Sequence, residues 1–273
     1  YKTSHAEKEE SEISKWAKDL GIKVEQFSKE QVLKIQPDIA MDIAGAFWYK
    51  SDAHSTPELF INNLKDYLIK NGVGFKLENT VKYFQKNNKQ IQKVVTDKGI
   101  FEADEFVLST GAWSQQILKD LGIKLLIQPG KGYRINVYKS TGIILPAILL
   151  ESKVAVTPME GFTRFGGTME ISGINYRTNI KRVHAIADSV IKYYPTLEIP
   201  KTSINDVQSG LRPLSPDGLP FIGRHSKIKN MVLATGHSMM GWSLGPATGQ
   251  LVTEVISGRK TSMDLKPFLP ERI

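Results

Sequence analysis

Cysteine is absent from the 273 residues of this chain. Its absence excludes disulfide frameworks, thiolate metal sites and cysteine nucleophiles, and it weakly favours a reducing compartment. Long hydrophobic runs are absent as well: the longest, residues 142–150, is about half the length of a membrane span and contains a proline. No signal peptide is recognisable in the first residues. We therefore expect a globular protein with a hydrophobic core.

Several motifs of common enzymes are also missing. The sequence has no Gly-x-Ser-x-Gly elbow, so we do not expect a hydrolase triad. It contains neither GxGxxG nor a Walker loop. The histidines show no metal-ligand spacing, so we predict no metal site. They are His5, His54, His184, His225 and His237.

Positive charge is in excess, with 36 lysines and arginines against 28 acidic residues and a net charge of +8. Such an excess can indicate nucleic acid or an anionic membrane surface as a partner. The lysines are scattered along the sequence, however, and no basic run is interleaved with aromatic residues. We therefore expect a solvated lysine-rich surface and no nucleic-acid binding, with weak membrane attraction as the alternative.

Hydrophobic patterning predicts helices and short strands in the first third of the chain. The first 40 residues are polar and helical, with a capping box at Ser28-Lys-Glu-Gln31, and residues 45–49 form a strand. Thr56-Pro57-Glu58 begins a helix that Asn71-Gly72 ends. Its apolar face carries Phe60, Leu64, Tyr67 and Leu68 at helical spacing.

Strands dominate the rest of the sequence. A strand at residues 74–77 precedes a β-meander over residues 81–85, 90–96 and 100–103, and residues 105–111 form a strand before a short helix capped by Ser114. In the strand-rich stretch 125–172, residues 153–157 pair with 164–169. Residues 179–194 form an amphipathic helix, and a last strand at 231–234 leads into a helix over 242–256. We infer two interleaved units. One is α/β, with strands at Gly74, Phe106 and Met231, and the other is a larger, mostly antiparallel sheet covered by helices.

Two glycine turns follow apolar strands and precede helices. One is ATGHSMMGW (residues 234–242), with Gly236 and Gly241, and the other is STGAWS (residues 109–114), with Gly111. A strand–glycine–helix arrangement presents backbone N–H groups at a helix N-terminus, which stabilises negative charge in a ligand. Plain connections between elements are the alternative interpretation.

Arg212 is the most suggestive charged residue, because it lies in SGLRPLSPDGLPFIG with no other charge before Asp217. An arginine can bind a carboxylate through two hydrogen bonds, which lysine cannot imitate. The alternative is a structural ion pair, for instance with Asp217 or Glu170. The sequence alone leaves both interpretations open.

These segments together resemble the D-amino-acid oxidase-like family of FAD-dependent oxidoreductases. The similarity lies in FVLSTGAWS (106–114), LRPLSPDGLPFIG (211–223) and ATGHSMMGWSLGPATG (234–249), and it covers nearly all of the chain from about Phe27. Three segments resemble the bacterial D-amino acid dehydrogenase branch most: PGKGYRINV (129–137), KVAVTP (153–158) and FGGTMEISG (165–173). The resemblance implies FAD as cofactor and a small D-amino acid as substrate.

The resemblance also implies roles for individual residues. Arg212 would bind the substrate carboxylate, and Lys131, Tyr133 and Arg164 are weaker candidates for contact with the substrate. The flavin-facing residues would be Gly111, Ala112, Trp113, Gly236, His237, Ser238, Met239, Met240, Gly241, Trp242 and Ser243. In terms of domains, residues 1–50 and 125–224 would bind substrate, and 51–124 and 225–273 would belong to an incomplete α/β FAD-binding domain that includes the meander. The implied fold class is α+β.

Departures from the family narrow the expected activity. Glycine oxidases carry an arginine where Met239 stands and an aromatic residue near Ala155, so the resemblance argues against glycine oxidase. Sarcosine-oxidase-like enzymes place an oxygen-activating lysine near Arg164, so a dehydrogenase that passes electrons to a quinone or another carrier is favoured over an oxidase. The alternatives are oxidation of another small carboxylate (D-hydroxyproline, glycine, sarcosine or a 2-hydroxy acid) and a non-catalytic binding module.

The family begins with a βαβ unit that carries GxGxxG and holds the FAD pyrophosphate, and this sequence has no such motif. We therefore expect the chain to correspond to the C-terminal two-thirds of an enzyme, and to be inactive and bind FAD weakly by itself. We expect a cytoplasmic protein, with peripheral contact at the inner face of the membrane as an option.

Overall fold

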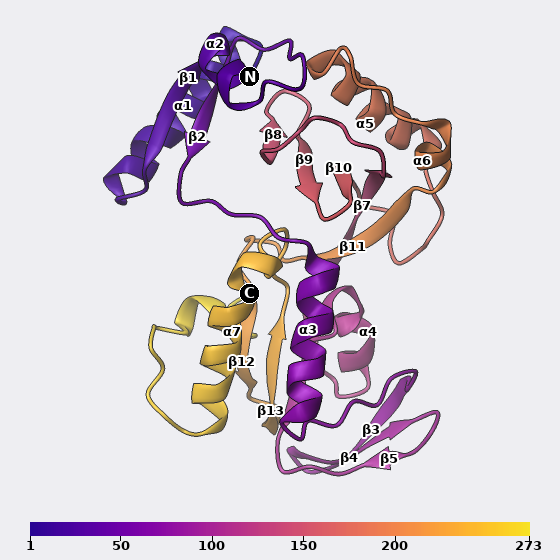
Figure 1. The fold of residues 1–273 in the computed structure, drawn as a ribbon. Coiled ribbons are helices and arrows are strands. Elements are labelled where there is room, and N and C mark those ends of the chain that lie inside the picture. The colour runs from indigo at the N-terminus through magenta and orange to yellow at the C-terminus, as the bar shows by residue number, and fades with distance from the viewer. The chain divides into compact units, whose positions relative to one another are not determined.

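The computed structural model describes residues 1–273, and the chain divides into two compact units (Figure 1). The first unit comprises Tyr1–Val73, Gly132–Met169 and Tyr176–Gly210. The second comprises Gly74–Lys131, Glu170–Asn175 and Leu211–Ile273. The chain therefore passes from one unit to the other more than once. None of its helices combines the length and the apolarity needed to cross a bilayer.

A small sheet and two helices form the N-terminal part of the first unit. These elements are α1 (Ser4–Asp19), β1 (Val24–Ser28), α2 (Lys29–Ile35) and β2 (Gly45–Tyr49). The predicted capping box is confirmed, because Ser28 Oγ accepts from Gln31 N at 3.4 Å and Gln31 Oε1 accepts from Ser28 N at 2.8 Å. The expectation of helix throughout the first 40 residues is wrong at β1, which forms because β2 pairs with it antiparallel.

Helix α3 (Pro57–Lys70) begins and ends where the sequence predicts. Thr56 occupies the N-cap position without a capping bond from its side chain. Instead, its hydroxyl accepts a hydrogen bond from Glu160 N at 3.1 Å. None of the helix's side chains is buried, so its predicted apolar face is largely exposed.

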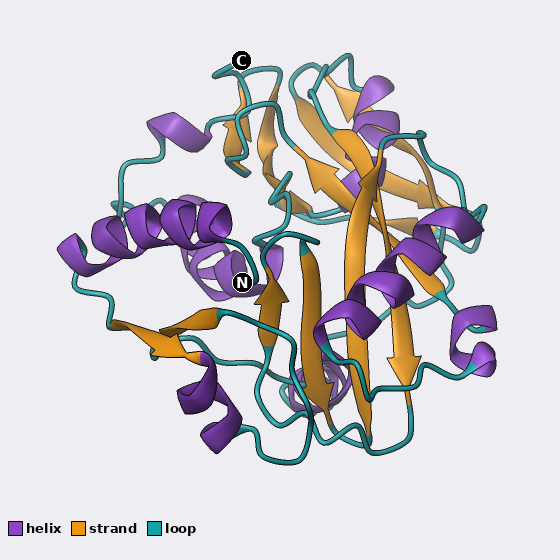
Figure 2. Ribbon diagram, turned by 90° about the horizontal axis from the view of Figure 1, so that it is seen from above, coloured by secondary structure: helices purple, strands orange, loops and turns teal.

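A five-stranded sheet in the order β11-β7-β10-β9-β8 carries the larger core. Its strands are β7 (Gln128–Val137), β8 (Ala147–Leu149), β9 (Val154–Met159), β10 (Phe162–Glu170) and β11 (Gln208–Leu214). β9 pairs antiparallel with β10, which confirms the predicted pairing around the turn at Gly161, and β8 pairs antiparallel with β9. Figure 2 shows the strands as orange arrows among the helices.

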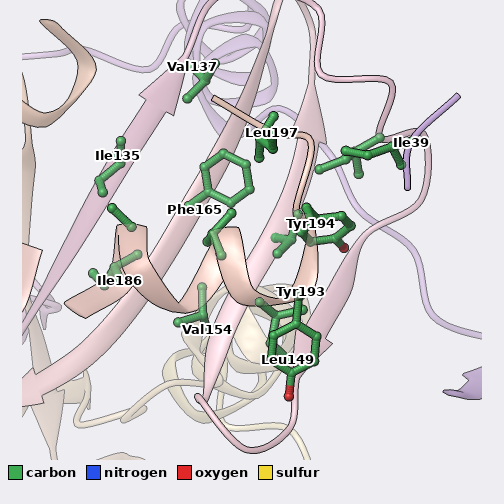
Figure 3. Packing of buried hydrophobic residues seen from close by; sticks show 14 of the residues in the cluster. Ile39, Ile135, Val137, Leu149, Val154, Phe165, Ile186, Tyr193, Tyr194 and Leu197 are labelled. Atoms are coloured by element: carbon green, nitrogen blue, oxygen red, sulfur yellow. The ribbon is translucent and has the colours of Figure 1, made fainter. Parts of the chain in front are cut away.

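Helix α5 (Ile180–Tyr193) contributes one apolar face to this core. Its buried residues recur every three or four positions, as an amphipathic helix requires. They are Val183, Ile186, Ala187, Val190 and Tyr193. Figure 3 shows Ile186 close to Phe165 and Val154 of the strands. Burying a valine or isoleucine side chain contributes about 1.5–3 kcal/mol. Pro195 follows the helix as predicted. The short helix α6 (Lys201–Asn205) was not predicted.

The second unit is built on a three-stranded sheet in the order β12-β13-β6 and a separate meander β3-β4-β5. Its elements are β3 (Val81–Asn87), β4 (Gln90–Thr96), β5 (Ile100–Phe101), β6 (Phe106–Leu108), a 3₁₀ turn (Gly111–Trp113), α4 (Ser114–Lys119), β12 (Phe221–His225), β13 (Ile228–Thr235), α7 (Gly241–Ile256) and a second 3₁₀ turn (Lys266–Phe268). The predicted meander, last strand and last helix are confirmed.

Strand β13 is buried on both faces. Met231 and Leu233 belong to one hydrophobic cluster with Leu118 of α4, whereas Val232 packs in another with Leu251 of α7. Successive side chains of a strand point to opposite faces, so a strand covered on both sides must be apolar throughout. This accounts for the continuous apolar run at 231–234.

Two local predictions in this unit are wrong. Residues 74–77 form no strand, and no neighbouring strand pairs with them; β12 is the third strand of the sheet instead. Ser114 does not cap α4 but is its first residue, because its hydroxyl is bonded elsewhere.

Candidate functional site

The two glycine turns lie at one edge of the three-stranded sheet. β6 and β13 are parallel neighbours, with Val107 opposite Val232. Their carboxyl ends therefore lie at the same edge, and each continues into one of the turns. In α/β sheets, ligands bind beyond the carboxyl ends of parallel strands. The structure thus brings together two segments that are more than 100 residues apart in sequence.

Two buried hydroxyl groups hold the turns together. Ser114 Oγ and Thr235 Oγ1 are 2.9 Å apart, and Ser114 Oγ also donates to the carbonyl of Gly111 at 2.8 Å. Both side chains are buried. Buried hydroxyls are stabilising only when hydrogen-bonded, so this pair fixes one turn against the other. Nothing in the sequence signals the pairing, and sequence analysis missed it.

Gly236 is required by the shape of its turn. Its φ angle is +76°, in the left-handed region that favours glycine. A Cβ atom at this position would lie 2.7 Å from Cδ2 of Phe221, a buried ring on β12. The turn can therefore pass close to β12 only with glycine here.

Replacing Gly236 with alanine is expected to lower the free energy of unfolding by about 2 kcal/mol, through the left-handed φ and the contact with Phe221. Chemical denaturation measures the effect. Gly249→Ala in α7 is the matched control, because nothing lies within 4 Å of its added Cβ and alanine favours a helix. Equal stability of Gly236→Ala and the unchanged protein would contradict this account of the turn.

Arg212 lies on a strand that is bonded to the second glycine turn. Leu214 of β11 forms a β-bridge with His237, and Ser238 N donates to the carbonyl of Pro213 at 3.0 Å. Arg212 itself is half-buried, and burial lowers the pKa of its guanidinium from the usual value. Guanidinium groups remain protonated in proteins, so the strand carries a partly desolvated positive charge beside the turn.

Asp217 is occupied by another arginine. Its carboxylate accepts from Arg272 Nε at 2.8 Å and from Arg272 Nη2 at 2.9 Å. This paired contact lowers the pKa of Asp217 to about 2. The alternative in which Asp217 is the structural partner of Arg212 therefore loses its support.

Lys131 is almost fully buried, with 1% of its surface exposed. Its ammonium group donates to Asn175 Oδ1 at 2.6 Å and lies 3.3 Å from Glu170 Oε1. Both partners lie in Glu170–Asn175, the short segment that groups with the second unit. A buried ammonium requires such partners, so these contacts favour a structural role for Lys131, which anchors that segment to β7.

The other two predicted substrate contacts, Tyr133 and Arg164, belong to the first unit. The Tyr133 hydroxyl donates to the carbonyl of Arg177 at 3.3 Å and accepts from Asn179 N at 3.0 Å. Arg164 donates to Glu58 Oε1 at 2.8 Å and to Asn136 Oδ1 at 3.0 Å. These hydrogen bonds are formed within the unit, and a role of either residue toward substrate stays a prediction.

His237 connects the second glycine turn to α7. Its Nε2 atom is 2.9 Å from the hydroxyl of Thr248, and burial lowers the pKa of the imidazole. A histidine with a lowered pKa is neutral at pH 7. His237 therefore fixes the turn against the helix without adding charge, and Thr248 is a second supporting residue that sequence analysis missed.

Large apolar side chains of both turns are exposed. The exposed fractions are 68% for Met239, 53% for Met240, 50% for Trp242 and 38% for Trp113. The N-cap residue of α7, Met240, provides no side-chain capping bond, and the first N–H groups of an α-helix have no partner within the helix. Apolar surface beside a helix N-terminus suits a flat ring system that carries negative charge, and reduced flavin has that chemistry. That residues 111–113 and 236–243 face an isoalloxazine ring stays a prediction.

Comparison with known proteins gives consistent matches. A family model described as "FAD dependent oxidoreductase" matches residues 1–255. D-amino acid dehydrogenase of Rhizobium rhizogenes is 31% identical over 271 residues, which cover 93% of this chain and 63% of that protein. D-amino acid dehydrogenase of Neisseria meningitidis is 33% identical over 249 residues, which cover 89% of this chain and 59% of that protein. The chain thus spans about three-fifths of the length of these relatives.

Solved structures share the fold. Glycine oxidase from Geobacillus kaustophilus superimposes with a TM-score of 0.85 at 23% identity, covering 100% of this chain and 73% of that one. L-proline dehydrogenase from P. horikoshii gives a TM-score of 0.86 at 22% identity, covering 99% and 74%. At this identity the similarity concerns the fold, and it agrees with the α+β class expected from the sequence.

Proposed function

The chain belongs to the FAD dependent oxidoreductase family, and from that premise we propose that it is part of an enzyme that oxidises small D-amino acids. The relatives named D-amino acid dehydrogenase support the substrate class. The observation that carries the proposal is the contact of the Arg212 strand with the turn at Gly236, beside the turn at Gly111. This arrangement joins a cation for a carboxylate to a surface for a flavin.

Each part of the site has a physical task. Arg212 holds the substrate carboxylate through charge-assisted hydrogen bonds, which fixes the orientation of the α-carbon. Met239, Met240 and Trp242 exclude water from the reacting atoms. The backbone N–H groups at the start of α7 favour negative charge near them. When bound, FAD accepts the hydride that leaves the α-carbon.

The products follow from the balance of the reaction. The substrate amine, bound in its neutral form, loses one proton to water as its α-carbon loses a hydride, which gives an imino acid. Water then converts the imino acid to a 2-oxo acid and ammonia.

The electron acceptor is a separate part of the proposal. Arg164 stands near the position where related oxidases carry an oxygen-activating lysine, which favours a quinone or another carrier as acceptor rather than oxygen.

Anaerobic reduction of the flavin tests the proposal. The full-length protein is expected to be yellow and to lose its visible absorption when D-alanine or D-proline is added, whereas L-alanine should leave the spectrum unchanged. If only sarcosine, glycine or a 2-hydroxy acid bleaches the flavin, the substrate is that compound and not a D-amino acid. A colourless full-length protein would instead support a non-catalytic binding module.

A further inference from the structure

The hydroxyl group of Ser215 is buried and has no hydrogen-bond partner. The residue is 9% exposed, and its Oγ atom is covered by protein. Buried polar side chains are almost always hydrogen-bonded, because an unpaired hydroxyl destabilises the folded protein. Ser114 and Thr235 of the same unit follow this rule, since their buried hydroxyls are 2.9 Å apart. The Ser215 hydroxyl is an exception for which the fold by itself gives no reason.

Ser215 lies beside the second glycine turn. It comes directly after β11, and the residue before it, Leu214, forms the β-bridge with His237. The carbonyl of Pro213 accepts from Ser238 N at 3.0 Å. All of these residues belong to the second unit. The unpaired hydroxyl is therefore one residue away from the contact between the Arg212 strand and the turn.

The backbone around Ser215 is held in place without the hydroxyl. Its carbonyl accepts from Gly218 N at 3.4 Å, and Arg272 holds the carboxylate of Asp217 through two hydrogen bonds. A serine that opens a turn often accepts a hydrogen bond from the backbone N–H two residues further on. Ser215 Oγ does not form this bond. A role in stabilising the turn therefore does not account for the side chain.

The hydroxyl is free to change its position. A serine side chain has three staggered positions, and rotation about its Cα–Cβ bond moves the hydroxyl alone. Because Oγ forms no hydrogen bond with the protein, rotation breaks none. Part of the residue is exposed, so rotation gives the hydroxyl a route toward a bound molecule.

The surroundings of Ser215 indicate what kind of molecule it contacts. Cofactor sites combine apolar surface with a few precisely placed polar groups. The neighbouring turn provides exposed apolar side chains, among them Met239 and Trp242. A hydroxyl can both donate and accept a hydrogen bond, which suits the carbonyl oxygens and ring nitrogens of a flavin. On the basis of the proposed function, we infer that the Ser215 hydroxyl forms a hydrogen bond with the ring system of the bound flavin.

Replacing Ser215 with alanine in the full-length protein tests the inference through two measurements. The Kd for FAD should rise about three- to tenfold, which corresponds to the loss of one neutral hydrogen bond. The melting temperature of the protein freed of FAD should be equal or higher, because alanine removes an unpaired buried hydroxyl. Titration with FAD followed by flavin fluorescence gives the first value, and circular dichroism gives the second. A hydroxyl that only stabilises the fold would instead lower the melting temperature when removed.

Ser226→Ala is the matched control. Ser226 belongs to the same unit, and its hydroxyl donates to a carboxylate oxygen of Glu271. This variant should bind FAD with unchanged Kd. An unchanged Kd in Ser215→Ala, or a lower melting temperature of that variant without FAD, would overturn the inference. The titration does not involve a substrate, so a protein that binds FAD but is not reduced by D-amino acids would contradict the proposed substrate and not the role of Ser215.

Discussion

Replacing Arg212 with alanine is expected to lower kcat/KM for a D-amino acid by about ten- to a hundredfold, since one charge-assisted contact contributes roughly 1.5–3 kcal/mol. The reason is the position of this guanidinium: it is half-buried, on the strand that is bonded to the turn at Gly236. Steady-state kinetics of the full-length enzyme with an artificial electron acceptor measures the effect. Most of the loss should appear as a higher KM if the contact is made equally in the ground state and the transition state.

Two further variants make this experiment specific. Arg212→Lys keeps the positive charge but not the planar arrangement of donors. Its kcat/KM should therefore lie between the values for Arg212→Ala and the unchanged enzyme. Arg259→Ala removes an exposed arginine of the same unit and should leave kcat/KM unchanged. Unchanged kinetics in Arg212→Ala would remove this residue from the substrate site, while flavin reduction would still report on the proposed reaction.

Replacing Lys131 with methionine is expected to lower the free energy of unfolding by about 3 kcal/mol or more, since it removes one partner of a buried ion pair. The ammonium group is 3.3 Å from Glu170 and 2.6 Å from Asn175, and the side chain is 1% exposed. Methionine fills similar space, so the loss measures charge and hydrogen bonding rather than a cavity. Denaturant titration monitored by tryptophan fluorescence gives the value.

The control for this change is Lys124→Met, which replaces an exposed lysine of the same unit. It should lower the free energy of unfolding by less than about 0.5 kcal/mol. Adding Glu170→Gln to Lys131→Met should restore part of the lost stability, because a partly buried carboxylate no longer lies unpaired beside an apolar side chain. A cost below about 1 kcal/mol for Lys131→Met alone would argue against a structural pair and would return Lys131 to the list of substrate contacts.

Local sequence signals predicted most of the secondary structure. The helix at α5, the capping box at Ser28 and the hairpin at β3-β4 each depend on residues within a few positions of one another. Two of the predictions that were wrong concern strands, which depend on residues far apart in the sequence. Residues 24–28 became a strand because β2 lies beside them, and residues 74–77 did not because no strand does. Strand formation needs a partner that a local pattern does not contain.

For the candidate site too, local sequence predicts some features and only the tertiary structure gives the others. The sequence by itself determined the chemistry available: two strand–glycine–helix turns, an arginine in a weakly charged run, and the family to which the chain belongs. The tertiary structure decided which groups meet. It joined Ser114 to Thr235 and the Arg212 strand to His237, and it paired Lys131 with Glu170. Local hydrogen bonding and periodicity are written in adjacent residues, whereas these contacts depend on how distant elements pack around shared cores.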